Sequence, residues 1–251
     1  MEIRFDNKVV LITGGSSGIG FSAASLFAEA GAIVYNLDIQ NSISEITGVT
    51  NLKCDVSDFE QVSTQIATII KNHGQIHHAF LNAGMHQVGN VESLDLDIID
   101  TVININIKGV IYCLKCILPT MREHQAGSIV LMGSDQSLVG KGDSFIYGAT
   151  KGAIAQLTKS TAIDYAAYNI RINCVCPGTI ETPLYHNAVA NFSKMKGLDK
   201  DEVYKNITTA QPIPRVGLPE EVANTVLFLC SEKTGFTTGS LITIDGGYVA
   251  Q

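Results

Sequence analysis

The residues with the most specific chemistry in this sequence are Tyr147 and Lys151, which form a Y-x-x-x-K pattern within a predicted helix. A four-residue step brings the two side chains to one helix face, ~6 Å apart along the axis. A free tyrosine has a pKa near ~10, and bringing it to ~7 requires ~4 kcal/mol of differential stabilisation of the phenolate. A neighbouring ammonium group supplies part of that stabilisation. The pair predicts a tyrosine that exchanges a proton with a bound molecule.

Two polar residues elsewhere in the chain support this interpretation of a pattern that amphipathic helices also produce by chance. Ser134 lies 13 residues before Tyr147, at the end of a predicted strand, where its hydroxyl would bind the reacting oxygen. Asn106 lies in a long apolar helix, where asparagine has low propensity and needs partners when it is buried. Two interpretations of Asn106 stay open: a water-linked proton relay to Lys151, or hydrogen bonding to the backbone without catalysis.

A glycine-rich turn follows the first predicted strand and precedes an amphipathic helix. Its glycines are spaced G-x-x-x-G-x-G rather than the commoner G-x-G-x-x-G. A turn without side chains lets the backbone reach a pyrophosphate, and the helix N-terminus offers unpaired N–H groups and the positive end of its dipole. The turn predicts dinucleotide binding by Gly14, Ser16, Ser17, Gly18, Ile19 and Gly20.

The charge at the end of the second predicted strand favours NAD over NADP. Asp38 stands 18 residues after Gly20, where a carboxylate accepts hydrogen bonds from the adenosine ribose hydroxyls and repels a 2′-phosphate. An aspartate that only caps the strand end or meets solvent is the alternative. No Arg or Lys is available to hold a 2′-phosphate at the neighbouring positions Ser16, Ser17, Ile39 or Gln40.

Two further strand ends complete the predicted cofactor site. Asp55 and Val56 follow the third strand, where they would contact the adenine edge, although Asp55 alternatively caps the helix that starts near Asp58. Asn82-Ala83-Gly84 follows the fourth strand, where small residues let the backbone lie against the cofactor.

A nicotinamide cofactor in this site gives the tyrosine and the lysine defined roles. The positive charge of the oxidised nicotinamide adds to that of Lys151 in stabilising the phenolate. Tyr147 then accepts the proton of an alcohol while hydride leaves the carbon, or donates the proton in the reductive direction. Lys151 also holds the nicotinamide ribose.

The elements that must position these residues alternate along the chain. Mostly apolar runs typical of strands covered on both faces lie at Lys8–Thr13, Ala32–Asp38, Asn51–Cys54, Ile76–Leu81, Ser128–Met132, Arg171–Cys176 and Leu241–Ile244. Helical stretches lie near 18–30, 58–72, 96–122, 146–167 and 219–230. This alternation predicts right-handed βαβ crossovers and an α/β fold: a Rossmann-type doubly wound parallel sheet of about seven strands, in one domain over residues 1–251.

One segment interrupts the alternation. Residues 181–214 follow a strand, are polar and contain Pro183, Pro212 and Pro214. Loops of this length in compact domains are usually functional. We expect a lid over the substrate, with one or two short helices.

Composition restricts the class of partner and the compartment. The formal net charge is −7, which disfavours nucleic acid and anionic membranes as partners. No stretch approaches the ~18 apolar residues of a membrane span. The six cysteines include Cys113 and Cys116 in C-x-x-C, but no second Cys or His pair stands nearby at metal-ligand spacing, so we expect no metal. Buried reduced thiols and a cytoplasmic location follow.

Over essentially its whole length the chain resembles the short-chain dehydrogenase/reductase family. The matching motifs are Thr13–Gly20, Asp38, Asp55, Asn82-Ala83-Gly84, Asn106, Ser134, Tyr147 with Lys151, Pro177-Gly178 with Thr182, and Asp245-Gly246-Gly247. The resemblance implies a catalytic tetrad of Asn106, Ser134, Tyr147 and Lys151. It also implies that Ile180 and Thr182 lie by the nicotinamide carboxamide, and that the protein is a homotetramer, a dimer of dimers. Leu81 departs from the family pattern, which often has a second Asn there.

The substrate is a small molecule whose class the sequence indicates less directly. Gln136, Lys141 and Asp143 lie on a loop between Ser134 and Tyr147 that should border the pocket. Lys141 would bind a substrate carboxylate, or is a solvated loop charge like Asp143. Further candidates at the rim, each also compatible with a structural or solvent-facing place, are His86, Tyr185 and His186.

Residues 171–179 resemble the branch of the family that contains cytosolic 3-hydroxybutyrate dehydrogenases and keto-deoxy sugar-acid dehydrogenases. That resemblance ranks a hydroxy acid or sugar acid first, a neutral sugar or polyol second and a 3-oxoacyl thioester third. A non-catalytic dinucleotide sensor on the same fold and a nucleic-acid-binding module are the rivals from other classes. The presence of Tyr147 and Lys151 disfavours the sensor, and the acidic balance disfavours the nucleic-acid module.

Overall fold

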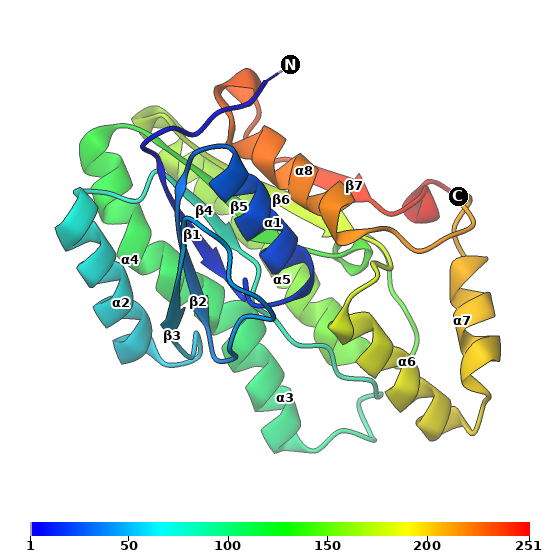
Figure 1. Ribbon diagram of the computed structural model, residues 1–251. Helices are drawn as coiled ribbons and strands as arrows, with labels where there is room; N and C mark the ends of the chain where they lie inside the picture. The colour runs from blue at the N-terminus through cyan, green and yellow to red at the C-terminus, as the bar shows by residue number, and fades with distance from the viewer. Residues whose placement is uncertain (1) are drawn as a thin grey trace.

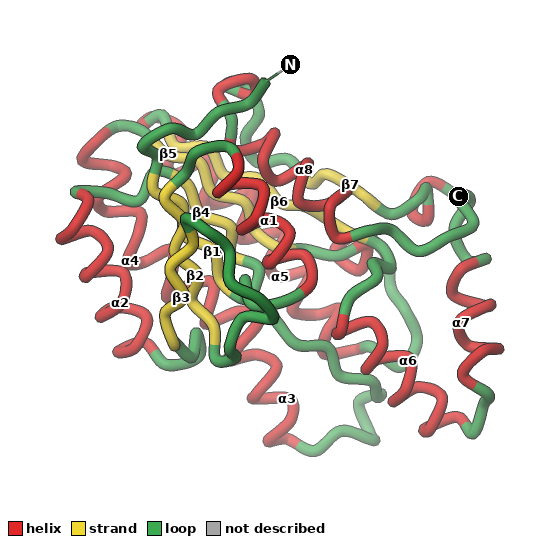
Figure 2. The backbone as a smooth tube through the Cα atoms, in the orientation of Figure 1, coloured by secondary structure: helices red, strands yellow, loops and turns green. Residues whose placement is uncertain are grey.

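The computed structural model describes residues 2–251 and contains one parallel sheet of seven strands in the order β3-β2-β1-β4-β5-β6-β7. Chain order reverses between β1 and β4, which is the switch point where ligands bind in doubly wound sheets. In Figure 2 the strands gather at the centre, with helices around them. The strands are β1 (Val9–Thr13), β2 (Ile33–Asp38), β3 (Val49–Lys53), β4 (His78–Leu81), β5 (Gly127–Met132), β6 (Ile170–Pro177) and β7 (Leu241–Ile244).

Helices cover both faces of the sheet, as Figure 1 shows, and each face has its own apolar core. On one face α1 (Gly18–Glu29) packs beside α8 (Pro219–Cys230) around Phe27, Phe80 and Val226. On the other face lie α2 (Phe59–His73), α4 (Gly109–His124) and α5 (Phe145–Tyr165). The predicted doubly wound fold is therefore confirmed.

The longest helical stretch combines α3 (Leu96–Ile103), a π-helical turn at Asn104–Lys108 and α4. By length and composition alone, Leu96–His124 is apolar enough to cross a membrane, with a mean hydropathy of 1.5 over its most apolar window. The sequence pattern did not predict such a stretch. Its apolar character has a local cause, because Val102, Ile117 and Met121 are buried in the fold.

Two helices lie outside the layers that cover the sheet, α6 (Pro183–Lys196) and α7 (Lys200–Thr208), at the lower right of Figure 1. They account for most of the predicted lid. Thr182 starts α6 by accepting a hydrogen bond from Tyr185 N, Pro183 occupies the first turn, and Gly197 ends it with a φ of 66°. Asp199 caps α7 in the same way.

The strand boundaries differ most from the prediction at the edge of the sheet. The third strand is Val49–Lys53 rather than Asn51–Cys54, and it is not an apolar run, because Thr50, Asn51 and Lys53 are exposed. An edge strand has one neighbour and less cover, so its side chains need not be apolar. The fourth strand begins at His78, two residues later than predicted.

Candidate active site

A cavity of about 630 Å³ runs along the carboxyl ends of β1, β2, β4, β5 and β6. Of the predicted residues, Ser16, Gly20 and Asn106 do not line it. Ser134, Tyr147 and Lys151 line one part of it, together with the predicted substrate residues Gln136, Lys141 and Tyr185. The predicted cofactor residues that line it are Gly14, Ser17, Gly18, Ile19, Asp38, Ile39, Asp55, Val56, Asn82, Ala83, Gly84, Pro177, Gly178, Ile180 and Thr182.

The glycine turn depends on close backbone approaches that a side chain would block. Gly14 has a φ of 69°, in the left-handed region that favours glycine. A Cβ on Gly20 would lie 2.2 Å from the carbonyl oxygen of Gly14. Ser17 starts α1 without a side-chain capping hydrogen bond, and Gly18 and Ile19 line the cavity. The first amides of α1 thus leave a place for an anion at the helix N-terminus.

Asn36 on β2 holds this turn, and the sequence analysis did not identify it. Its Oδ1 accepts a hydrogen bond from Gly15 N at 2.7 Å, and its Nδ2 donates to Ser16 Oγ and to Asn51 Oδ1. Asn36 is fully buried. The available signal was an asparagine in the middle of an otherwise apolar strand, because a buried amide needs partners.

The two predicted carboxylates at the adenosine end make different contacts. Asp38 accepts hydrogen bonds from Ser16 N at 3.0 Å and from Gln40 N at 2.9 Å, and it faces the cavity. Asp55 accepts from both the amide and the hydroxyl of Ser57. Asp58, not Asp55, caps α2. The capping alternative for Asp55 is therefore wrong in detail, because Asp55 supports the turn before the helix.

Asn82 joins the end of β4 to the glycine turn. Its side-chain amide donates to the carbonyl oxygens of Thr13 and Gly14 at 3.0 and 2.9 Å. The Thr13 hydroxyl in turn accepts from the backbone amides of Asn82 and Ala83. These bonds hold two neighbouring strand ends in one arrangement beside the cavity.

The structure brings Tyr147 and Lys151 together on α5, as their spacing predicts. Lys151 Nζ lies 5.4 Å from the centre of the Tyr147 ring and donates to Met132 O at 2.7 Å. Burial raises the pKa of the Tyr147 phenol, the neighbouring Ser134 hydroxyl opposes the rise, and the Asp135 charge adds to it. Burial also lowers the pKa of Lys151 to about 8. Burial therefore disfavours the charged form of both groups, but at neutral pH the Tyr147 phenol is neutral while Lys151 is still mostly protonated.

Ser134 is held by a short turn at the end of β5. Its backbone N–H donates to Ser137 Oγ, whose hydroxyl donates to Lys151 O at 2.9 Å. The Ser134 Oγ accepts from Gln136 N at 3.2 Å and donates to Asp135 Oδ1 at 2.9 Å. Hydrogen bonds between the turn and α5 thus set where Ser134 lies relative to Lys151.

Asn106 lies in the π-helical turn and forms hydrogen bonds with two other segments of the chain. Its Oδ1 accepts from Met85 N and its Nδ2 donates to Met85 O, both at 2.9 Å. The Nδ2 also donates to Thr150 Oγ1 at 3.1 Å. Asn106 therefore anchors the chain after β4 to α5.

We expect Asn106→Ala to destabilise the protein by about 1–3 kcal/mol, because it leaves two partly buried backbone groups of Met85 without these partners. Urea denaturation measures this change. Asn104→Ala is the matched control, since Asn104 stands in the same turn and its side chain makes no hydrogen bond within residues 2–251. Equal stability of the two variants would contradict the anchoring role.

The three predicted rim residues have different environments. His86 is not solvent-facing: its ring lies 4.7 Å from that of Tyr147, and burial lowers its pKa to about 4. Tyr185 is buried in the lid and lines the cavity. His186 does not line the cavity and instead contacts Glu181 at 2.7 Å and Tyr204 at 2.9 Å.

The inner face of the lid is apolar, although the segment is polar overall. Its cavity-lining residues on α6 follow helical spacing, and the sequence analysis missed this pattern. At the start of the lid, Thr182 lies against the glycine turn. A Cβ added to Gly18 would be 3.1 Å from Thr182 Cγ2. The apolar lining from the lid comprises Leu184, Ala188, Val189, Phe192 and Ile207.

The loop opposite the lid carries paired charges. Lys141 Nζ lies 2.5 Å from Asp135 Oδ2 and 4.4 Å from the centre of the Tyr248 ring. Asp143 forms an ion pair with Lys196 of α6 at 2.7 Å. Both loop charges are therefore ion-paired and partly exposed, at 28% of the side chain for Lys141 and 23% for Asp143.

All six cysteines are free, and five of them are buried. Burial raises the pKa of Cys54 to about 11 and that of Cys230 to about 12. Cys174 and Cys176 lie behind Gly133, with their sulfurs 3.8 Å apart. This burial agrees with the expected reduced thiols.

Comparisons with known proteins cover nearly the whole chain. A family model described as enoyl-(acyl carrier protein) reductase matches residues 14–249. The 2-keto-3-deoxy-L-fuconate dehydrogenase of Xanthomonas campestris pv. campestris is 36% identical over 98% of this chain and 81% of its own length. The 3-oxoacyl-[acyl-carrier-protein] reductase FabG of Thermotoga maritima is 34% identical, over 98% of this chain and 100% of its own.

Solved structures also match nearly the whole chain. A short chain dehydrogenase family protein from Francisella tularensis is 39% identical, with a TM-score of 0.89 over 97% of this chain and 99% of that one. The aldohexose dehydrogenase of Thermoplasma acidophilum is 34% identical, with a TM-score of 0.91 over 98% and 95%. ElxO, solved with NADP bound, is 31% identical, with a TM-score of 0.87 over 97% and 99%. The chain belongs to the short-chain dehydrogenase/reductase family, whose members are oxidoreductases that act on alcohols or ketones with a nicotinamide cofactor.

Proposed function

We propose that this protein is an NAD-dependent oxidoreductase that transfers hydride between nicotinamide and a small polar secondary alcohol or ketone, with Tyr147 as general acid and base. The observation that carries the proposal is one cavity lined by Tyr147, Lys151 and Ser134 and also by the carboxylate of Asp38. This arrangement provides a proton-transfer group and a place for a dinucleotide in the same space.

The residues present fit such a cofactor. The uncapped N-terminus of α1 would hold the pyrophosphate, and Asp38 would accept hydrogen bonds from the adenosine ribose. Asp38 would also repel a 2′-phosphate, and Ile39 beside it offers no positive charge, so we propose NAD although the related ElxO structure contains NADP. When bound, the cofactor supplies or accepts the hydride.

The chain's own residues handle the proton. Ser134 Oγ would hold the reacting oxygen, and Tyr147 would take the proton from it or return it. Lys151 Nζ, fixed by Met132 O, would stabilise the phenolate and hold the nicotinamide ribose. Asn106 keeps the Met85 segment in place through the hydrogen bonds described above.

For the substrate we propose a hydroxy acid or sugar acid. Gln136 Oε1 is buried without a hydrogen-bond partner within residues 2–251 and would accept from a substrate hydroxyl. The ammonium of Lys141 has three N–H donors, and the contact with Asp135 uses one. The remaining donors would bind a substrate carboxylate. The relative that acts on 2-keto-3-deoxy-L-fuconate supports this class.

A second candidate is a 3-oxoacyl thioester, and a specific observation favours it. The lid contributes an apolar wall that includes Leu184, Val189 and Phe192, which would cover an acyl chain. The FabG relative supports the same substrate class. A neutral sugar or polyol remains the third candidate, supported by the aldohexose dehydrogenase structure.

Lys141→Met tests the carboxylate proposal. We expect it to raise the KM for hydroxy acids at least tenfold and to leave the KM for neutral polyols within about twofold, since it removes a charge-assisted contact worth ~1.5–3 kcal/mol. Initial rates with both substrate classes at one pH measure the ratio. Lys196→Met is the matched control, because that lysine is ion-paired with Asp143 but does not line the cavity. An equal rise in the KM for hydroxy acids and in the KM for neutral polyols would contradict the proposal.

We also propose that the protein is a cytoplasmic homotetramer, a dimer of dimers, with neither nucleic acid nor membrane as a partner. Family resemblance supports the assembly, and the net charge of −7 supports the absence of nucleic acid. Light scattering with size-exclusion chromatography should give four times the chain mass of 26.9 kDa. A monomer would overturn the assembly.

A further inference from the structure

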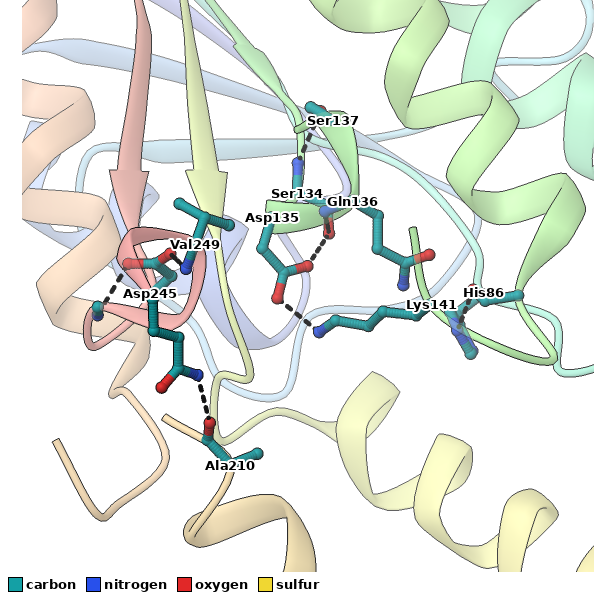
Figure 3. A network of polar contacts seen from close by, with 12 residues as sticks. His86, Ser134, Asp135, Gln136, Ser137, Lys141, Ala210, Asp245 and Val249 are labelled. Atoms are coloured by element: carbon teal, nitrogen blue, oxygen red, sulfur yellow. Dashed lines mark hydrogen bonds and ion pairs between the residues drawn. The ribbon is translucent and has the colours of Figure 1, made fainter. Parts of the chain in front are cut away.

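A buried ion pair adjoins the proposed catalytic residues. Asp135 follows Ser134 directly, its side chain is 3% exposed, and it contacts Ser134 Oγ through one oxygen and Lys141 Nζ through the other. Figure 3 shows the Lys141 side chain extending toward the Asp135 carboxylate. Burying a carboxylate without a positive partner is costly, so Lys141 has a role at this point beyond holding the loop.

The hydrogen bonds of the Ser134 hydroxyl indicate the role of Asp135. A serine hydroxyl has one proton and two lone pairs. The proton is directed to Asp135 Oδ1 at 2.9 Å, and one lone pair accepts from Gln136 N at 3.2 Å. Asp135 Oδ1 and Gln136 N thus fix where Ser134 Oγ lies. The hydroxyl proton would turn from Asp135 to the reacting oxygen of a bound ketone, which can only accept a hydrogen bond.

We propose that Asp135 is a positioning residue for the Ser134 hydroxyl, and that Lys141 offsets part of the Asp135 charge so that Tyr147 can still lose its proton. The inference rests on the proposed role of Tyr147. It assigns Lys141 an electrostatic function whether or not the ammonium also binds a substrate carboxylate. Tyr248, over whose ring Lys141 Nζ lies, helps to hold the ammonium in place.

The other charged and titratable groups near Tyr147 are positive, neutral or ion-paired. Lys151 on α5 is mostly positive at neutral pH, since burial lowers its pKa only to about 8. His86, from the segment after β4, is neutral because its pKa is lowered to about 4. Asp143 on the loop is paired with Lys196 of α6. Tyr185, from the lid, has its pKa raised to about 12 by burial and is neutral. Among the described residues, Lys141 is the ion-pair partner of Asp135. How strongly the Asp135 charge acts on Tyr147 therefore depends on Lys141.

The charges of Asp135 and Lys141 determine in which direction each variant shifts the titration midpoint of Tyr147. A negative charge near a phenol disfavours the phenolate, so Asp135→Asn should lower the Tyr147 titration midpoint, by about one pH unit. Lys141→Met exposes Tyr147 to the uncompensated carboxylate and should raise the midpoint by a similar amount. The double variant Asp135→Asn with Lys141→Met has neither charge and should titrate near the wild type. Lys141→Arg keeps the charge and should do the same.

The midpoint can be measured without a substrate. NMR of protein labelled with ¹³Cζ-tyrosine, saturated with NAD⁺, follows each of the eight tyrosines through a pH titration, and the resonance absent from Tyr147→Phe identifies Tyr147. Lys196→Met is the control for loss of an ion pair elsewhere on the loop and should leave the midpoint unchanged. Because Lys141→Met removes the partner of a buried carboxylate and so lowers stability, the comparison of Asp135→Asn with the double variant is decisive on its own.

The expected order of midpoints is Asp135→Asn lowest, wild type and double variant together, and Lys141→Met highest. Equal midpoints for wild type and Asp135→Asn, or a double variant that titrates with Asp135→Asn, would overturn the inference. Failure of the proposed function would give a different result. In that case Tyr147→Phe would keep its turnover, whatever the order of the titration midpoints. A purely structural role for the ion pair would change stability but leave the midpoints together.

Discussion

Replacing Tyr147 by Phe should reduce turnover by at least about a thousandfold and leave cofactor affinity nearly unchanged. General acid–base catalysis typically contributes ~10²–10⁴-fold, and this substitution removes the hydroxyl that would exchange the proton. His86, whose ring contacts Tyr147, is a weak substitute because burial lowers its pKa to about 4. Steady-state rates together with NADH fluorescence titration separate the loss of turnover from any loss of binding.

A matched variant guards against an indirect effect on the fold. Tyr185→Phe removes the hydroxyl of another cavity-lining tyrosine, which lies on the lid. We expect that variant to keep its turnover within a few-fold. Turnover in Tyr147→Phe equal to that of Tyr185→Phe would show that the proton moves through another group.

The second large effect is expected at the adenosine end of the cavity. Asp38→Ala should raise the KM for NAD by about tenfold to a hundredfold, because it removes hydrogen bonds to a charged acceptor worth ~1.5–3 kcal/mol. It should also lower the KM for NADP, since the repulsion of a 2′-phosphate disappears. Adding Ile39→Arg should strengthen the change, because Ile39 is 58% exposed and an arginine there has room to reach a phosphate.

Rates with both cofactors measure the preference in each variant. Lys53→Ala serves as the control, since Lys53 pairs in register with Asp38 on the neighbouring strand β3 and does not line the cavity. A wild-type enzyme that already prefers NADP would contradict the role given to Asp38. The loss of the Ser16 N–H contact to Asp38 affects both cofactors and therefore does not change the ratio between them.

The sequence predicted the parts of the site that depend on local patterns. The turn at Thr13–Gly20, the spacing of Tyr147 and Lys151, and the position of Asp38 at a strand end each involve residues whose separation is set by one turn, helix or strand. Because parallel strands end at the same edge, their placement around one cavity followed from the alternation of strands and helices. The last strand and the last long helix have the predicted boundaries.

The parts that were missed depend on contacts between distant residues. His86 meets Tyr147 across 61 positions of sequence, and nothing in either neighbourhood indicates that contact. Lys141 reaches Asp135 only because the intervening loop folds back, so its ion pair could not be inferred from a list of loop charges. The apolar inner face of α6 did follow a helical period, but the polar composition of the segment as a whole concealed it.

The most direct test of the proposed activity is NADH formation, followed at 340 nm, with the wild-type protein and a panel of hydroxy acids, sugar acids, polyols and secondary alcohols, with NADP in parallel. We predict a clear NAD-linked rate among the acids, which Tyr147→Phe abolishes. Absence of NADH formation across the panel, in protein that binds NADH by fluorescence, would contradict the proposed dehydrogenase activity on these alcohols and favour a reductase of another ketone or a non-catalytic sensor.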